Sequence, residues 1–247
     1  MRIPIIRGLI DRRVLVNFRV DPEVLARVCP PPFRPQIVNG YGVAGICLIR
    51  LKQIRPKHLP SFLGVASENA AHRIAVQWDA NDVVQSGVYI PRRDTSSLMT
   101  AFAGGRLFPG VHHRARFDVR ETEHDCRIAM ASVDGTVHAA VEGQTTEALP
   151  EASVFATVAE CSQFFEAGSL GYSPANSAAN SAAEFDGLEL RTVNWHVQPL
   201  SVRQVQSSFF DDRDAFPAGS VTFDNALLMR GIEHEWHSRT SLCGACG

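Results

Sequence analysis

The chain has 247 residues, 45% of them hydrophobic, and a formal net charge of −2, which suits one globular domain with its own core. No dense cluster of Lys and Arg is present, so the composition argues against a nucleic-acid partner. The longest apolar run, residues 41–49, is too short for a membrane span, and the first residues lack the features of a signal peptide. Six irregularly spaced cysteines do not resemble a secreted disulfide framework, so we expect a cytoplasmic protein.

The first half of the chain predicts one helix followed by strands. The sequence Asp21-Pro22-Glu23 predicts a helix start, because Asp caps a helix, Pro suits its first position and Glu complements its dipole. The helix is expected to end before Pro30. Residues 40–53 are rich in Val, Ile and Leu and predict a buried strand, and residues 71–78 and 87–90 predict shorter strands.

The clearest strand signal lies in residues 111–119, where side chains alternate with period two. His113 shares one parity with the apolar residues of this segment, whereas His112 shares the other parity with arginines. Adjacent strand residues point to opposite faces, so only one of the two histidines is expected to face inward. The pattern favours His113.

The second half of the chain predicts a hairpin, one helix and further strands. Asp134-Gly135 separates two apolar alternations, which is a strong hairpin signal. Thr157 and Glu160 form a capping box for a helix that ends near Gly168. An exposed loop is expected at residues 173–183, and strands are expected at residues 188–197, 202–210 and 233–238. We therefore predict a mainly β (α+β) fold with two or three short helices, and sheets of this kind often curl around a cavity.

Several short segments occur in a characteristic order along the chain: Val14–Phe18 before the first helix, Pro30–Phe33, Gly40–Ile46, Glu68, Arg73, Gly87–Tyr89 and Gly110–Arg116. In this order they resemble an uncharacterised bacterial family of the acetoacetate decarboxylase-like superfamily. It implies a curved, two-layered antiparallel sheet, or barrel-like cone, around a ligand cavity, and a homo-oligomer. The domain is expected to span residues 1–240, with a C-terminal tail at 241–247.

Decarboxylases of this superfamily use a cavity lysine that forms a Schiff base with the keto acid. The best matching positions here are His112 and His113, and imidazole cannot form an iminium. The chain has only two lysines, Lys52 and Lys57, and both are distant from these positions in the sequence. We therefore expect no Schiff-base decarboxylation.

The candidate catalytic residues are His113, Glu68 and His112, because imidazole and carboxylate groups can transfer protons near neutral pH. The candidate substrate-binding residues are Arg73, Arg106, Arg114 and Tyr89, since arginine binds carboxylates through a planar fork. Each has an ordinary alternative, such as a hydrogen-bonded core histidine, a solvated glutamate or a surface arginine.

Three functions remain open at this point. The favoured one is an enzyme-like cavity for a small organic acid or carbonyl compound, with lyase, hydratase or isomerase chemistry and no cofactor. The second is a non-catalytic small-molecule binding protein. The third is a metal-dependent enzyme that uses His113, or a C-terminal cluster of His234, His237, Cys243 and Cys246.

Overall fold

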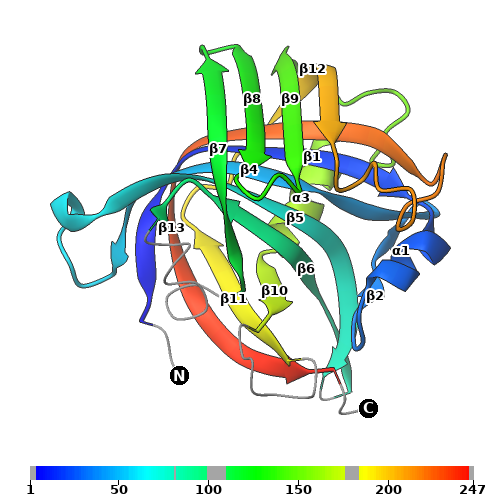
Figure 1. The fold of residues 1–247 in the computed structure, drawn as a ribbon, viewed down its shortest axis with the longest axis horizontal. Coiled ribbons are helices and arrows are strands. Elements are labelled where there is room, and N and C mark those ends of the chain that lie inside the picture. The colour runs from blue at the N-terminus through cyan, green and yellow to red at the C-terminus, as the bar shows by residue number, and fades with distance from the viewer. Residues whose placement is uncertain (1–3, 81, 99–109, 176–183, 245–247) are drawn as a thin grey trace.

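The computed structural model describes residues 4–80, 82–98, 110–175 and 184–244 (Figure 1). In this part of the chain, two helices accompany a sheet of thirteen strands, so the mainly β prediction is confirmed. Neither helix has the length and hydropathy that a membrane crossing requires. The elements are β1 (Ile6–Val20), α1 (Pro22–Val28), β2 (Arg34–Pro35), β3 (Ile37–Val38), β4 (Tyr41–Pro56), a 3-10 turn (Ser61–Leu63), β5 (Val65–Ala80), β6 (Val83–Thr95), β7 (His112–Glu121), β8 (Asp125–Ser132), β9 (His138–Thr145), α3 (Val158–Ala167), β10 (Leu170–Pro174), β11 (Glu184–Thr192), β12 (Gln198–Ser207) and β13 (Val221–Cys243).

Both helices begin where their caps predict. The Asp21 carboxylate accepts a hydrogen bond from the Glu23 amide at 2.8 Å, ahead of α1. The Thr157 hydroxyl accepts one from the Glu160 amide at 3.1 Å, ahead of α3. Helix α3 ends at the residue before Gly168, as the sequence indicated.

The sheet is large and curved, and it branches instead of forming a regular barrel. The first part of β13 pairs with β12, whereas its second part pairs with β11. Gly231 lies between the two parts with φ +65°, a conformation that favours glycine. Strand β6 branches in the same way, because Val88 and Tyr89 pair with β10, while Arg93 to Thr95 pair with β7. In Figure 1, β7, β8 and β9 rise above the molecule, while β10, β11 and the second part of β13 curve below it.

Branching gives the sheet two interiors, one on each face of the shared strands β1, β4 and β5. We call the cluster around Val14, Ile46, Ile74, Ile128 and Phe210 the first core; it lies against β7, β8, β9 and β12. We call the cluster around Ile10, Leu15, Leu51, Phe155 and Phe165 the second core; it contains α3. Alternate residues of a shared strand therefore enter different cores.

Several strands differ from their predicted extents. Strand β1 has 15 residues and β13 has 23, but the sequence signalled only short parts of each. The antiparallel prediction holds except that β6 runs parallel to β7 and β10. Strand β13 continues to Cys243, which pairs with Glu184, so it enters the segment assigned to a tail at 241–247. Most of the predicted loop at 173–183 lies outside the described residues.

Candidate functional site

A cavity of about 160 Å³ lies on the second-core face of the sheet. Its wall comes from β1, β4, β5, β6, β10, β11 and β13, with the first residue of β7 and the residue after α3. Most of the wall is apolar, including Ile49, Leu51, Val88, Ile90, Leu190 and Trp236. The curved lower part of the fold thus carries a small chamber.

Three arginines line this apolar chamber: Arg13, Arg73 and Arg93. The guanidinium of Arg73 lies over the ring of Phe165 at 4.6 Å and donates to the amide oxygen of Asn17. That oxygen belongs to a neutral group, so the hydrogen bond orients the charge without cancelling it. Asn17 is held in turn by its own amide, which donates to Asn225 at 2.7 Å.

The other two arginines also have neutral partners. Arg13 donates from Nε to the sulfur of Cys47 at 3.3 Å and lies over the ring of Trp195 at 5.8 Å. Arg93 donates from Nε to the hydroxyl of Ser173 at 3.0 Å. Within the described ranges, no carboxylate lies at ion-pair distance from any of the three cavity arginines.

Burial lowers the pKa of Arg73 to about 10 and the pKa of Arg93 to about 10, because a low-dielectric environment disfavours the charged form. Both groups still carry their charge at neutral pH. A chamber with several buried and unneutralised positive charges is costly to maintain, and an anion would offset that cost. The chamber wall also includes the carboxylate of Asp94, which pairs with Arg92 at 2.9 Å, so Arg13, Arg73 and Arg93 are the groups that can bind an anion here.

The imidazole side chain of His112 also lines the chamber. Burial, together with the charge of Arg93, lowers its pKa to about 3, so it is neutral at pH 7. Its Nδ1 lies 3.2 Å from the carbonyl oxygen of Gly110, and because a carbonyl only accepts, Nδ1 must carry the proton. Nε2 is then the unprotonated ring nitrogen.

The structure therefore brings two of the sequence candidates, Arg73 and His112, to the cavity, and places three others on the first-core face. These three are Glu68, His113 and Tyr89, none of which lines the chamber. Arg114 is exposed and does not line it either. Arg106 lies outside the described residues.

The expectation that His113 faces the cavity is not met. Its Nδ1 lies 3.2 Å from the carboxylate of Asp134, in the turn between β8 and β9. The alternation in residues 111–119 did identify a buried face, since Ala115 and Phe117 pack in the first core. The cavity is on the opposite face, because His112 pairs with Arg93 in the sheet and shares its side. The pattern could not show that there are two interiors.

Glu68 and Tyr89 have structural roles on the same opposite face. Glu68 accepts from Arg12 at 2.6 Å and from Arg50 at 2.6 Å, and the Arg12 side chain is fully buried. Tyr89 stacks on Phe33 with ring centroids 5.5 Å apart. Neither side chain is placed to assist His112 or His113.

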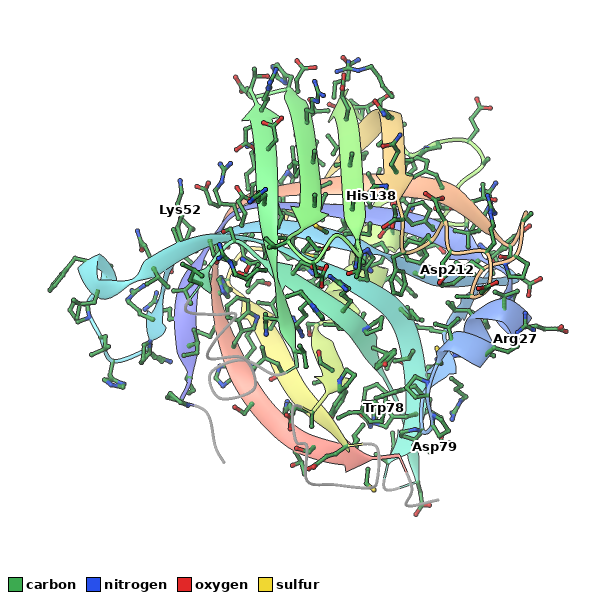
Figure 2. The ribbon with its side chains drawn as sticks, in the orientation of Figure 1. Arg27, Lys52, Trp78, Asp79, His138 and Asp212 are labelled. Atoms are coloured by element: carbon green, nitrogen blue, oxygen red, sulfur yellow. The ribbon has the colours of Figure 1, made fainter. Side chains whose placement is uncertain are left out.

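Both lysines of the chain lie away from the chamber. The Lys52 amine pairs with Asp11 at 2.9 Å, and the Lys57 amine pairs with Glu235 at 2.8 Å. Lys52 lies in the upper part of the molecule, away from the lower strands β10 and β11 (Figure 2). Since the chain has no other lysine, the cavity contains no side-chain amine for a Schiff base.

Sequence reasoning missed Arg13, Arg93 and Cys47. Each lies in or beside an apolar strand. Arg13 could have been recognised because it is a charged residue on the same face of the strand as buried apolar residues.

The proposed C-terminal metal cluster is not assembled in the described part of the chain, where no group of three or more metal-binding side chains is found. His237 instead pairs with Glu235 at 3.1 Å, and Cys246 lies outside the described residues.

Comparisons with known proteins agree with this architecture. A model of the family DUF2071, described as an uncharacterized conserved protein, matches residues 10–214. The chain belongs to the DUF2071 family. Among curated proteins, none matches the sequence significantly.

Solved structures show that this DUF2071 member has the acetoacetate decarboxylase-like fold. Acetoacetate decarboxylase from Legionella pneumophila superposes with a TM-score of 0.64 at 8% identity, over 97% of this chain and 88% of that one. An acetoacetate decarboxylase-like enzyme from Sphingomonas wittichii RW1 gives 0.63 at 11% identity, over 98% and 94%. The enduracididine biosynthesis enzyme MppR complexed with pyruvate gives 0.63 at 10% identity, over 99% and 91%. At such low identity, the likeness concerns the fold alone.

Proposed function

We propose that this protein binds a small organic acid in its cavity and holds the carboxylate with Arg13, Arg73 and Arg93. The observation that carries the proposal is the set of three cavity arginines with no carboxylate partner among the described residues. Arginine matches a carboxylate through two parallel N–H donors. The apolar wall would strengthen that interaction by excluding water.

The size of the chamber supports a small ligand. A volume of about 160 Å³ corresponds to roughly five waters at about 30 Å³ each, which suits an acid with a short carbon chain. MppR binds pyruvate within the same fold, so 2-oxo acids are the first class to test. This use of MppR is an analogy of fold and ligand size only.

Any catalysis here would proceed without an iminium, because neither lysine reaches the chamber. His112 is the cavity group placed for proton transfer, and Nε2 would be the base once a bound carboxylate raises the pKa that burial and Arg93 lower. Lyase, hydratase or isomerase chemistry on a carboxylate whose neighbouring carbon loses or gains a proton is compatible with this arrangement. His112 thereby takes the role that the sequence suggested for His113 and Glu68.

The second candidate function is binding without turnover. It is favoured by the engagement of Glu68 with Arg12 and Arg50, which leaves His112 without that carboxylate as an assistant. Incubation of the protein with each ligand found, followed by mass spectrometry of the small molecule, separates the two functions. A homo-oligomer remains what the family resemblance implies, and a cytoplasmic location remains a prediction from the cysteine pattern.

A thermal-shift screen tests the binding proposal. We expect 2-oxo, 2-hydroxy or unsaturated short-chain acids at about 100 times their Kd to raise Tm by roughly 5–10 °C. Arg73→Met should abolish this shift. Arg114→Met, which removes an exposed arginine outside the cavity, should preserve it. The proposal fails if no acid shifts the wild type, or if both variants respond equally.

The neighbouring histidines supply a matched test of the chemistry. For any acid that is turned over, His112→Gln should lower kcat at least about 100-fold, the usual contribution of one positioned acid–base group. His113→Gln alters only the contact with Asp134 and should leave kcat within a factor of two or so. The reverse ranking would move the chemistry to the other face of β7.

A further inference from the structure

We propose that Cys47 is the nucleophile of the cavity and adds to the carbonyl carbon of a 2-oxo acid whose carboxylate the arginines hold. This inference rests on the proposed function and names the group that reacts. It concerns a residue that the sequence did not single out, on the buried strand β4.

The surroundings of Cys47 distinguish it from the other described cysteines. It lines the chamber, and the Nε–H of Arg13 donates to its sulfur at 3.3 Å. Arg73 and Arg93 line the same chamber as this sulfur. Reactive cysteines are found beside positively charged groups of this kind.

Three other cysteines lie outside the chamber. Burial raises the pKa of Cys29 to about 12 and that of Cys161 to about 12, and it also raises the pKa of Cys126. None of the three lines the chamber. Buried thiols in apolar surroundings are unreactive, so they serve as internal references for Cys47.

A second observation points to a ligand beside the sulfur. The Arg73 side chain is 4% exposed and lines the same chamber, yet its Nε has no hydrogen-bond partner in the described part of the chain. A buried and unsatisfied N–H of this kind is costly. A carboxylate held there would place the adjacent carbonyl within the chamber that Cys47 also lines.

The chemical step is a balanced addition. The sulfur forms a bond to the carbonyl carbon while the carbon–oxygen double bond becomes a single bond, and the thiol proton ends on that oxygen. The product is a hemithioketal, with no change in oxidation state and no co-reactant. It is the sulfur counterpart of the carbinolamine that an amine would form, without the later loss of water to an iminium.

Charge-matched alkylation tests the reactivity. Iodoacetate carries a carboxylate and iodoacetamide is its neutral analogue. The rate of Cys47 alkylation by iodoacetate divided by the rate with iodoacetamide therefore measures how strongly the cavity arginines attract an anionic reagent. Measured by peptide mass spectrometry, this ratio should be at least ten times higher in the folded protein than in urea. Arg13→Gln should lower the ratio toward the unfolded value, whereas Arg114→Gln should not. Pyruvate should protect Cys47 from both reagents.

The adduct itself can be observed by carbon-13 NMR with pyruvate labelled at its carbonyl carbon. We expect the bound signal to move from the carbonyl region to that of a tetrahedral carbon, and Cys47→Ser to abolish this change. If Cys47 is not alkylated in the folded protein, or if the ratio equals that in urea, the inference is overturned. Acids that still raise Tm in that case leave the binding proposal intact; loss of both effects rejects both.

Discussion

At the scale of single residues, Arg12 and Arg73 are two buried arginines with opposite environments. Arg12 faces Glu68 at 2.6 Å and Glu121 at 3.8 Å, so its charge is compensated. Arg73 faces an amide, an aromatic ring and the cavity. The first arrangement stabilises the fold, and the second keeps a charge available at the expense of stability.

This contrast predicts opposite effects of the same substitution. Arg73→Met keeps most of the side-chain volume and removes an uncompensated charge, although Asn17 loses a donor, so the ligand-free protein should be at least as stable as the wild type. Arg12→Met leaves Glu68 with one fewer partner and should lower the free energy of unfolding by at least about 2 kcal/mol. Urea denaturation without ligand measures both. Equal losses would show that Arg73 is a structural residue.

Residue types could be predicted from the sequence better than residue positions. Of the sequence candidates, Arg73 and His112 line the cavity, whereas neither lysine does. Glu68, His113 and Tyr89 were misplaced because alternation defines two faces without saying which one borders a cavity. That distinction depends on contacts between strands that are far apart in the sequence.

At the scale of elements, helix α3 forms the support of the cavity. It lies in the second core, presents Phe165 beneath the guanidinium of Arg73 at 4.6 Å, and is followed by Gly168 on the cavity wall. The Trp195 indole also donates to Ser162 of this helix at 2.9 Å. The position of Arg73 therefore depends on the stability of α3.

The cap of α3 gives a test with a conservative control. Thr157→Ala removes the acceptor for the Glu160 amide and should cost about 1 kcal/mol, or roughly 2–4 °C in Tm. Thr157→Ser retains the hydroxyl and should stay within about 0.5 kcal/mol of the wild type. Calorimetry of the three proteins measures the difference. Equal losses would mean that the methyl group of Thr157, and not its hydroxyl, stabilises the helix.

Elements with local signals were predicted well, and those fixed by distant contacts were not. A few adjacent residues determine each helix cap, at Asp21 and Thr157, and the hairpin at Asp134-Gly135. The length of β13 depends on two different partners, β12 and β11, and its bend at Gly231 has no local marker beyond the glycine itself. The branching of the sheet therefore could not be predicted from the sequence.

At the scale of the whole molecule, three buried histidines set the response to acid. Burial lowers the pKa of His72 to about 3, of His112 to about 3 and of His234 to about 4. Between about pH 4 and pH 6.5 the unfolded chain binds these protons and the folded chain does not. The free energy of unfolding that these neutral histidines contribute is therefore complete above pH 6.5, and it falls as the pH decreases through this window.

We expect the free energy of unfolding to fall by up to about 4 kcal/mol per pH unit in the lower part of this window, since each histidine contributes about 1.4 kcal/mol per unit. His72→Leu should reduce the slope by about a third. His138→Ala, at an exposed position (Figure 2), should leave the slope unchanged. Urea denaturation at a series of pH values gives these slopes, and a flat profile would contradict the prediction.

The alternation of β5 between two interiors has a consequence for how this family can diversify. Ser67, Asn69, Ala71 and Arg73 line the cavity, together with the small Ala70, while His72 stacks on Phe209 at 4.5 Å in the first core. Substitutions at every second position can therefore alter which acid is accepted without disturbing the packing that the remaining positions maintain. The cavity-facing and core-facing positions of this one strand can therefore evolve independently, so the ligand preference can change while the fold is preserved.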